Sequence, residues 1–301
     1  MRIGFVMTPW RGFSPRTRAE PLLRAKAAPF GLNFVPVIWV VFSALISAVL
    51  YPGPAVAQPG QSRVSWRTLA PDLEVAERSL SPGILSSPIV LVRSALKTHR
   101  LGVIRATEFG MRRGEVKTLC RLSKASVCIN ANFFDELGDP LGVVMSRGIL
   151  HHRIHSGGRT LTGIIQATRQ GVDIIPRQSF TSSAVLDAIQ AGPRLVVDGA
   201  RSPDIRDLTR TGRSAVCLDQ KGRLIFLASS AGFRGLTFTE LQDLLLDENV
   251  ACKVALNLDG GGSSQLFVAP PASAHSTTAE AISLNGFDQV PVALALFDDK
   301  E

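Results

Sequence analysis

Short runs in which apolar residues alternate with polar ones, or follow one another directly, occupy most of the chain from residue 89 onward. Turn residues break these runs, and their lengths and patterns are typical of β-strands. The predicted strands cover residues 89–96, 100–106, 125–134, 142–150, 161–167, 171–176, 192–199, 214–219 and 223–229. Between the last two lies the stretch Asp-Gln-Lys-Gly-Arg, which predicts a hairpin turn.

Helical periodicity is clear in only one place, residues 236–248. Thr237 and Glu240 have the spacing of a capping box, and leucines follow at helical intervals. A second helix is predicted over residues 111–122. Strands without a regular βαβ alternation favour an α+β fold. We therefore expect a single domain with a mostly antiparallel or mixed β-sheet core and a few flanking helices.

The N-terminal region has the pattern of a targeting segment. Basic residues precede an uncharged run over residues 30–50, and the small-x-small sequence Ala55-Val56-Ala57 follows. This arrangement predicts a signal peptide over residues 1–57 and hence an exported protein, periplasmic or secreted. A retained membrane anchor is the alternative, because the run approaches the roughly 20 residues that span a bilayer. Residues 58–88 then form a connecting segment with a strand at 64–69, and residues 89–301 form the main domain.

The N-terminal segment also accounts for much of the basic character of the 301-residue chain. Of 33 basic and 25 acidic residues, residues 1–57 hold six and one, so the remainder has 27 and 24, a net charge of +3 rather than +8. The remainder contains no basic run interleaved with aromatic residues, so a nucleic-acid partner is not expected. Membrane association is expected only through the N-terminal segment.

Four cysteines lie in the exported part: Cys120, Cys128, Cys217 and Cys252. They allow three disulfide pairings, and the sequence does not choose among these or free buried thiols. No Cys-x-x-Cys pair is present, so zinc binding and thioredoxin-like chemistry have no support.

The stretch Lys253–Phe267, KVALNLDGGGSSQLF, ends an alternating strand with an unusual corner. Alternation places Asn257 and Asp259 on the face opposite the core. Three glycines allow a tight turn and close approach of a ligand, and successive amides in such a turn can bind an anion. We expect substrate-binding groups in this corner, with Asp259 acting beside them; a glycine-rich hairpin with an Asx-turn is the alternative. The corner comprises Gly260, Gly261, Gly262, Ser263 and Ser264.

A second alternating strand, over residues 125–134, places Asn130 and Asn132 on one face. Asparagine is disfavoured in strands, so two on one face suggest hydrogen bonding to a ligand, with turn asparagines as the alternative. Asp135 follows as a second carboxylate, a metal ligand or a turn residue. Further on, His151, His152 and His155 lie in a predicted hairpin without the Glu of a His-Glu-x-x-His motif, which disfavours metal binding. His155 or Arg159 is a candidate for contacting phosphate.

Six motifs in order resemble those of the phosphodiester glycosidase family, over residues 101–297. They are NANFFD (130–135), GVVMSRGIL (142–150), AGPRLVVDG (191–199), RTGRSAVCLDQKGRLIFL (210–227), RGLTFTELQDLLL (234–246) and ALNLDGGGSSQLF (255–267). The chain departs from the family pattern at Ala131 and Cys217, where glycine is common.

The resemblance implies a hydrolase that cleaves a sugar-1-phosphodiester linkage, and it assigns roles to the candidate residues. A departing phosphate needs less protonation than an alcohol, so one carboxylate can replace the usual pair. Asp259 would stabilise the oxocarbenium-like centre, attack it or activate water. Arg213 would clamp the phosphate, with Arg210 as the fallback, and Asn132 and Asn257 would bind sugar hydroxyls or phosphate. No cofactor is implied, and a divalent cation has no support in the sequence.

Three alternatives remain open at this point. The chain could be a non-catalytic carbohydrate-binding protein of the cell envelope, or a phosphodiesterase that breaks the P–O bond instead. A serine hydrolase using Ser263 or Ser264 is disfavoured because the second glycine of a Gly-x-Ser-x-Gly elbow is absent. The expected partner is a sugar-phosphate diester, with a cell-envelope or capsular polymer as one candidate.

Overall fold

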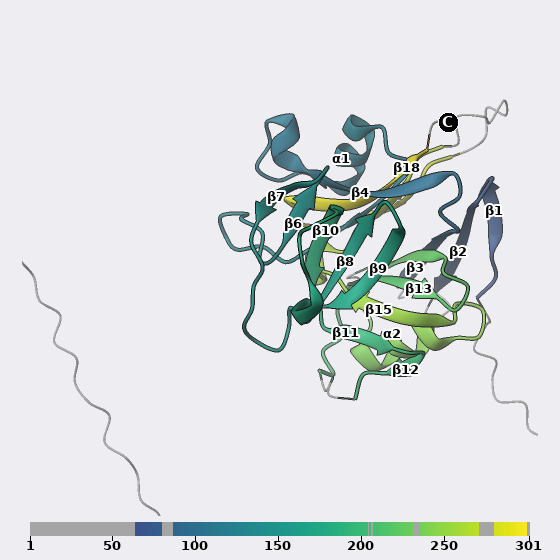
Figure 1. Ribbon diagram of the computed structural model, residues 1–301. Helices are drawn as coiled ribbons and strands as arrows, with labels where there is room; N and C mark the ends of the chain where they lie inside the picture. Colours follow the sequence, from purple (N-terminus) through teal and green to yellow (C-terminus); the bar gives the residue numbers. More distant parts are fainter. Residues whose placement is uncertain are drawn as a thin grey trace, which may run out of the picture. The chain divides into compact units, whose positions relative to one another are not determined.

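A computed structural model describes residues 64–79, 87–203, 205, 207–230, 235–270 and 280–299 (Figure 1). The predicted signal segment over residues 1–57 lies outside the described residues. Three β-sheets make up most of the described structure, and every strand pair with a defined register in them is antiparallel.

The largest sheet has eight strands. In spatial order they are β1 (Arg67–Ala70), β2 (Leu73–Ser79), β3 (Pro88–Ser94), β14 (Leu224–Ser229), β13 (Arg213–Asp219), β15 (Cys252–Asn257), β11 (Arg194–Val197) and β12 (Ala200–Arg201). The segment predicted to connect the signal peptide to the main domain thus contributes β1 and β2 to one edge of this sheet. The predicted hairpin between β13 and β14 is confirmed by their continuous antiparallel register.

Two five-stranded sheets complete the β-structure. One contains β7 (Ile149–His152), β6 (Val144–Ser146), β10 (Val185–Ala191), β8 (Gly163–Thr168) and β9 (Gly171–Pro176). The other contains β17 (Ile282–Leu284), β16 (Leu266–Val268), β5 (Val127–Asn130), β18 (Val292–Asp298) and β4 (His99–Arg105).

One apolar cluster joins the inner faces of the three sheets, because the strands alternate buried and less buried positions toward it. Phe226, Ile129 and Ile165 represent the three sheets in this cluster, and each is at most 1% exposed. Burial of apolar surface in this cluster is the main favourable contribution to the free energy of folding.

The two α-helices cover outer sheet faces. The helix α1 (Val116–Ser123) packs on the sheet of β5 and β16 through Leu119. The helix α2 (Phe238–Leu246) packs Leu241 and Leu245 on the eight-stranded sheet, beside β11 and β15 (Figure 1). Short 3-10 turns occur at Ala106–Phe109, Arg177–Ser179 and Gly261–Ser263.

Both predicted helices are present, although α1 begins at Val116 rather than at residue 111, and the capping box is present as expected. The Thr237 hydroxyl accepts the Glu240 amide at 3.2 Å, and the Glu240 carboxylate accepts the Thr237 amide at 3.0 Å. The described part of the fold is therefore α+β with a strong bias toward antiparallel β-structure. The sequence pattern did not predict β18, although this strand lies between β5 and β4 in its sheet.

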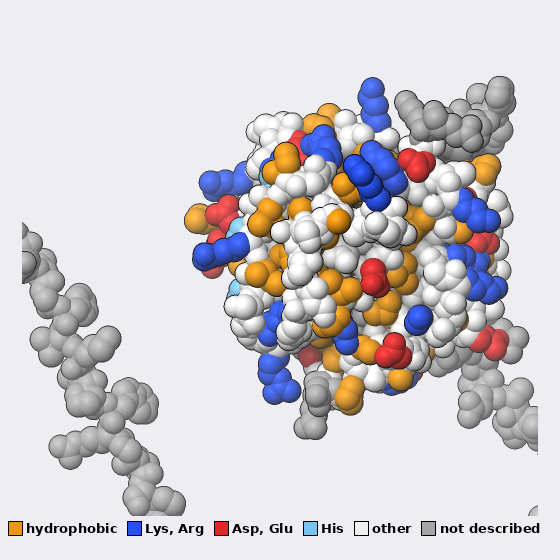
Figure 2. Space-filling model, viewed as in Figure 1, with side chains coloured by type: hydrophobic (Ala, Val, Ile, Leu, Met, Phe, Trp, Pro, Cys, Tyr) orange, Lys and Arg blue, Asp and Glu red, His pale blue; other side chains and the backbone are white. Residues whose placement is uncertain are grey.

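The cysteines form two disulfide bonds, Cys120–Cys128 and Cys217–Cys252. The first ties α1 to β5, and the second joins the neighbouring strands β13 and β15. Such bonds are typical of proteins that fold in an oxidising compartment. None of the described helices is long and apolar enough to cross a membrane. On the face shown in Figure 2, basic side chains are dispersed among acidic, polar and apolar ones.

Candidate active site

The register of three neighbouring strands explains why distant motifs meet. The strand β15 runs antiparallel to both β13 and β11, with Ala215 opposite Asn257 and Arg194 opposite Leu256. The C-terminal end of β15 therefore lies beside the starts of its two neighbours. This arrangement brings the glycine corner after β15 to the same edge of the sheet as Arg213 and Arg194.

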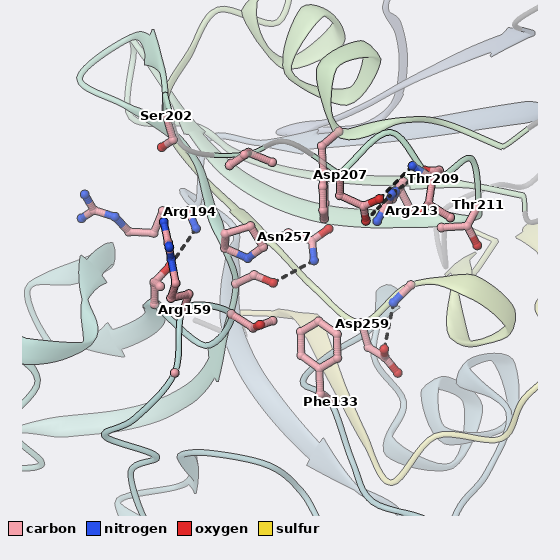
Figure 3. Close-up of a pocket in the computed structure, with 18 of the residues that line it drawn as sticks. Phe133, Arg159, Arg194, Ser202, Asp207, Thr209, Thr211, Arg213, Asn257 and Asp259 are labelled. Atoms are coloured by element: carbon pink, nitrogen blue, oxygen red, sulfur yellow. Dashed lines mark hydrogen bonds and ion pairs between the residues drawn. The ribbon is translucent and has the colours of Figure 1, made fainter. Parts of the chain in front are cut away.

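A cavity of about 1050 Å³ opens at this edge. Its walls combine the end of β15, the starts of β11 and β13, the loop before β8 and Phe133 after β5. Figure 3 shows Asp259 and Phe133 on one side of the cavity, Arg159 and Arg194 on the other, and Asn257 between them. A concave site of this size that holds a few polar groups is the usual form of a small-molecule pocket.

Asp259 is mostly buried in the cavity wall and is held on several sides. Its backbone amide donates to the Ala131 carbonyl at 2.9 Å. Its backbone carbonyl accepts a hydrogen bond from Nδ2 of the Asn130 side chain at 2.7 Å. Burial, and to a smaller extent the negative charge of Asp288, raises the pKa of the Asp259 carboxyl from 3.8 to about 6. Hydrogen bonds from the Ser263 hydroxyl and the Gly260 amide oppose this change. The carboxyl is therefore poised to change its protonation state near neutral pH.

The glycine corner fixes Asp259 in place. Gly261 has a φ of +62°, a conformation that favours glycine. Four corner amides donate within the protein: Gly260 to Asp259 Oδ1 (2.9 Å), Gly261 to the Gly212 carbonyl (2.8 Å), Ser263 to the Gly260 carbonyl (3.1 Å) and Ser264 to the Gly261 carbonyl (3.3 Å). The donors from which we expected an anion cradle thus mainly stabilise the turn that presents the carboxylate.

The three candidate asparagines occupy different positions. Asn130 lies behind the cavity, where its Oδ1 accepts from the Ser214 hydroxyl at 2.7 Å and the Gln265 amide at 3.1 Å. Asn257 lines the cavity and donates to the Gly192 carbonyl at 2.9 Å. The Oδ1 atoms of Asn132 and Asn257 are buried, and neither has a hydrogen-bond partner among the described residues.

Arg213 lines the cavity, but most of its donors are engaged. Its Nε donates to the Leu236 carbonyl at 3.0 Å, and its Nη2 donates to the Thr209 carbonyl at 2.7 Å. The guanidinium lies 3.8 Å from the centre of the Phe238 ring and 3.7 Å from Asp207 Oδ2. Burial lowers the pKa of Arg213, and the charge of Asp207 opposes this change. Arg213 therefore holds positive charge in the wall and joins β13 to residues 207–209 and 236–238.

Arg210, the fallback for the phosphate clamp, points to another partner. It donates to both carboxylate oxygens of Glu240, at 2.9 and 2.5 Å, at the start of α2. It thus forms an ion pair with α2 and does not line the cavity.

Two other predicted binding residues lie away from the cavity lining. Asp135 is exposed and closes a turn, since its carboxylate accepts the Asp139 amide at 2.8 Å. His155 is exposed, and its ring nitrogen lies 3.2 Å from the Gly157 carbonyl oxygen. His151 and His152 belong to β7 as expected. The described residues contain no cluster of three or more His, Cys, Asp or Glu side chains that could hold a metal ion.

The two serines of the corner are almost fully buried. Ser263 hydrogen-bonds to the Asp259 carboxylate, and the Ser264 hydroxyl has no partner among the described residues. No hydrogen bond links either serine to a histidine within the described part of the chain, so the base of a serine nucleophile is not in place here.

Sequence reasoning did not single out several residues that line the cavity, among them Phe133, Arg194, Thr209 and Thr211. Arg194 had one recognisable signal, because a charged residue begins an otherwise apolar strand within a glycine-proline motif. The position of that strand beside β15 could not be inferred from local pattern.

The sequence profile of the phosphodiester glycosidase family matches residues 123–297. The chain therefore belongs to the phosphodiester glycosidase family. The matched region contains the glycine corner, Arg213, Arg194 and the candidate asparagines. No curated protein sequence matches the chain.

Solved structures share the fold. The catalytic domain of zebrafish N-acetylglucosamine-1-phosphodiester alpha-N-acetylglucosaminidase, auto-inhibited by its pro-peptide, is similar with a TM-score of 0.58 and 18% identity, over 79% of this chain and 87% of that one. A hypothetical protein from Synechocystis gives a TM-score of 0.56 and 17% identity over 78% of this chain. The present chain spans 64% of that protein's length. At these identities the likeness concerns the fold.

Proposed function

We propose that this protein is an exported hydrolase that cleaves the bond between the anomeric carbon of a sugar and the phosphate of a phosphodiester. Family membership supports the reaction class. The observation that carries the proposal is the buried Asp259 carboxylate, held at a rigid corner in the wall of a cavity that also contains Arg213.

The distribution of carboxylates in the cavity fits this chemistry. Asp259 and Asp207 are the acidic residues among the described residues that line it. Asp207 lies beside Arg213, and the Thr209 hydroxyl and amide hold the pKa of Asp207 below its ordinary value. Of these two carboxylates, Asp259 has no cationic partner among the described residues. A single acting carboxylate suits a phosphate leaving group, which needs little protonation on departure.

In the proposed reaction, Asp259 acts in its ionised form at the anomeric carbon. It stabilises the oxocarbenium-like centre, attacks it or activates the water that does so. Arg213 supplies positive potential for the departing phosphate from the adjacent wall. The unpaired Oδ1 of Asn257 is a hydrogen-bond acceptor, so it suits a sugar hydroxyl rather than a phosphate, which offers only acceptors.

Export is supported by the two disulfide bonds as well as by the N-terminal pattern. A phosphodiesterase that breaks the P–O bond is the second candidate, because the same cavity would accept the same substrate. The choice depends on which bond breaks, and product analysis distinguishes the two reactions.

The test is turnover of a panel of glycosyl-1-phosphodiesters by the protein that lacks residues 1–57. Free sugar and a phosphate monoester are the expected products. In water enriched in oxygen-18, C–O cleavage places the label in the sugar, whereas P–O cleavage places it in the phosphate. Sugar-1-phosphate as the product would replace the proposal with the phosphodiesterase, and no turnover of any member of the panel would favour a carbohydrate-binding protein.

A further inference from the structure

Four arginines line the cavity, and they differ in whether an acidic side chain neutralises them. Two of them are paired with aspartates: Arg213 with Asp207, and Arg201 with Asp243. Arg159 and Arg194 have no acidic partner among the described residues. Both lie on the side of the cavity opposite Asp259 (Figure 3). That side therefore carries two uncompensated positive charges.

Hydrogen bonds from Gln190 and Arg177 hold the backbone of the loop that carries Arg159. Gln190 is fully buried on β10, and its Nε2 donates to the carbonyls of His155 and Leu161 at 2.7 and 2.9 Å. Its Oε1 accepts the His155 amide at 2.9 Å. The Arg177 guanidinium donates to three carbonyls of the same loop, those of Gly157, Gly158 and Leu161. The backbone on both sides of Arg159 is thus fixed, although the Arg159 side chain is exposed.

Arg194 is positioned by a different set of contacts. Its backbone amide donates to the Thr162 hydroxyl at 3.0 Å, which attaches β11 to the end of the loop that carries Arg159. The stem of its side chain lies over Gly163, where an added Cβ would come within 2.8 Å of the Arg194 Cγ. The absence of a side chain at residue 163 therefore leaves room for Arg194 along the cavity wall.

We propose that Arg159 and Arg194 form a subsite for a second phosphate group, on the leaving-group side of the scissile phosphodiester. The inference rests on the proposed function, which places the sugar beside Asp259. A guanidinium binds phosphate through paired hydrogen bonds, and two unneutralised guanidinium groups exceed what one singly charged diester requires. The volume of the cavity leaves room beyond one sugar and its phosphate. The substrate class is a sugar-phosphate that carries at least two phosphates, as in a repeating sugar-phosphate polymer.

Two synthetic diesters of N-acetylglucosamine-1-phosphate test the subsite, one with a methyl and one with a phosphoethyl leaving group. The sugar follows the name of the zebrafish enzyme. Binding to the Asp259→Asn variant of the full chain is measured by calorimetry, and kcat/KM is measured with unsubstituted protein. We expect the phosphoethyl diester to bind about 10- to 100-fold more tightly than the methyl diester in low salt. Only its second phosphate can form charged hydrogen bonds with Arg159 and Arg194.

Adding Arg159→Ala and Arg194→Ala should abolish that preference, with a much smaller loss of affinity for the methyl diester, which lacks the second phosphate. The corresponding lysine variants should restore part of it, since lysine keeps the charge but loses the paired geometry. Arg169→Ala is the matched control, because Arg169 is an exposed arginine outside the cavity lining and its loss should leave the preference unchanged.

The outcomes separate the subsite from the reaction. A preference in binding that depends on the two arginines supports the subsite even if neither diester is hydrolysed, and in that case the proposed reaction fails for this sugar. Hydrolysis of both diesters with equal kcat/KM and equal affinity overturns the subsite and leaves the reaction intact. Failure of the phosphoethyl diester to bind overturns the subsite as well.

Discussion

The two sides of the cavity are built in opposite ways. Around Asp259, backbone amides, carbonyls and the Asn130 side chain form a closed network, and the carboxyl is mostly buried. On the other side, Arg159 and Arg194 extend from braced backbone with no acidic partner among the described residues. The first side resembles a preorganised catalytic centre, whose polar groups are fixed before substrate arrives. The second resembles a binding surface, whose charges a substrate would neutralise.

The largest expected effect follows from removing the charge on the closed side. Asp259→Asn should lower kcat by about 10²–10⁴-fold, because an amide can neither attack nor act as a base. Substrate affinity should change much less. Turnover of the glycosyl-1-phosphodiester panel measures the effect. Asp173→Asn is the control, since it is the same substitution at an exposed position of β9. Retained activity in Asp259→Asn would place the chemistry elsewhere.

Arginines on the two sides should differ in their contributions to stability. Arg213→Ala should lower the free energy of unfolding by about 2–4 kcal/mol, because it leaves the Leu236 and Thr209 carbonyls without their donor and uncovers Phe238. Arg194→Ala should change it by about 0.5 kcal/mol or less, since the Arg194 side chain makes no hydrogen bond to the described residues. Urea unfolding with the disulfides intact measures both. Equal losses would show that Arg194 is as structural as Arg213.

The pH dependence of activity should report the protonation state of Asp259. Because burial raises the pKa of this carboxyl to about 6, kcat/KM should fall about tenfold per pH unit below that value and level off above it. The substrate diester does not titrate in this range, so the limb belongs to the enzyme. A rate that instead falls above pH 6 would mean that Asp259 acts as an acid.

The same carboxyl should weaken the fold above its unfolded pKa. The folded pKa of about 6 exceeds the value of 3.8 expected in the unfolded chain, so the unfolded state loses its proton first as the pH rises. The resulting loss of stability develops between these two values and is complete above them. Asp259→Asn should therefore stabilise the protein by about 1–3 kcal/mol at pH 7.5 and have little effect near pH 3.5.

Unfolding of Asp259→Asn and of the unsubstituted protein at the two pH values tests this prediction. A loss of stability in Asp259→Asn at pH 7.5 would mean that the hydrogen bonds from Gly260 and Ser263 outweigh the burial of the charge. The closed side would then stabilise the fold.

The sequence predicted the local features that depend on short-range physics. The capping box at Thr237, the hairpin between β13 and β14 and the turn at the glycine corner all follow from residue type and spacing. The motifs also indicated the phosphodiester glycosidase family, which the sequence profile confirms. Residue type alone did not distinguish Asn130 from Asn132, although one has a full set of hydrogen bonds and the other has a free acceptor.

Alternation and turn chemistry are properties of a few consecutive residues, and so the chain by itself determined most of its strands, its principal helix and the corner that presents Asp259. The disulfide pairing, the packing of Arg213 on Phe238 and the position of Arg194 beside β15 were decided only by the tertiary structure. The Cys217–Cys252 bond and the position of Arg194 depend on antiparallel register between distant segments, because register determines which side chains face one another across strands. The contact of Arg213 with Phe238 depends on where α2 packs on the sheet.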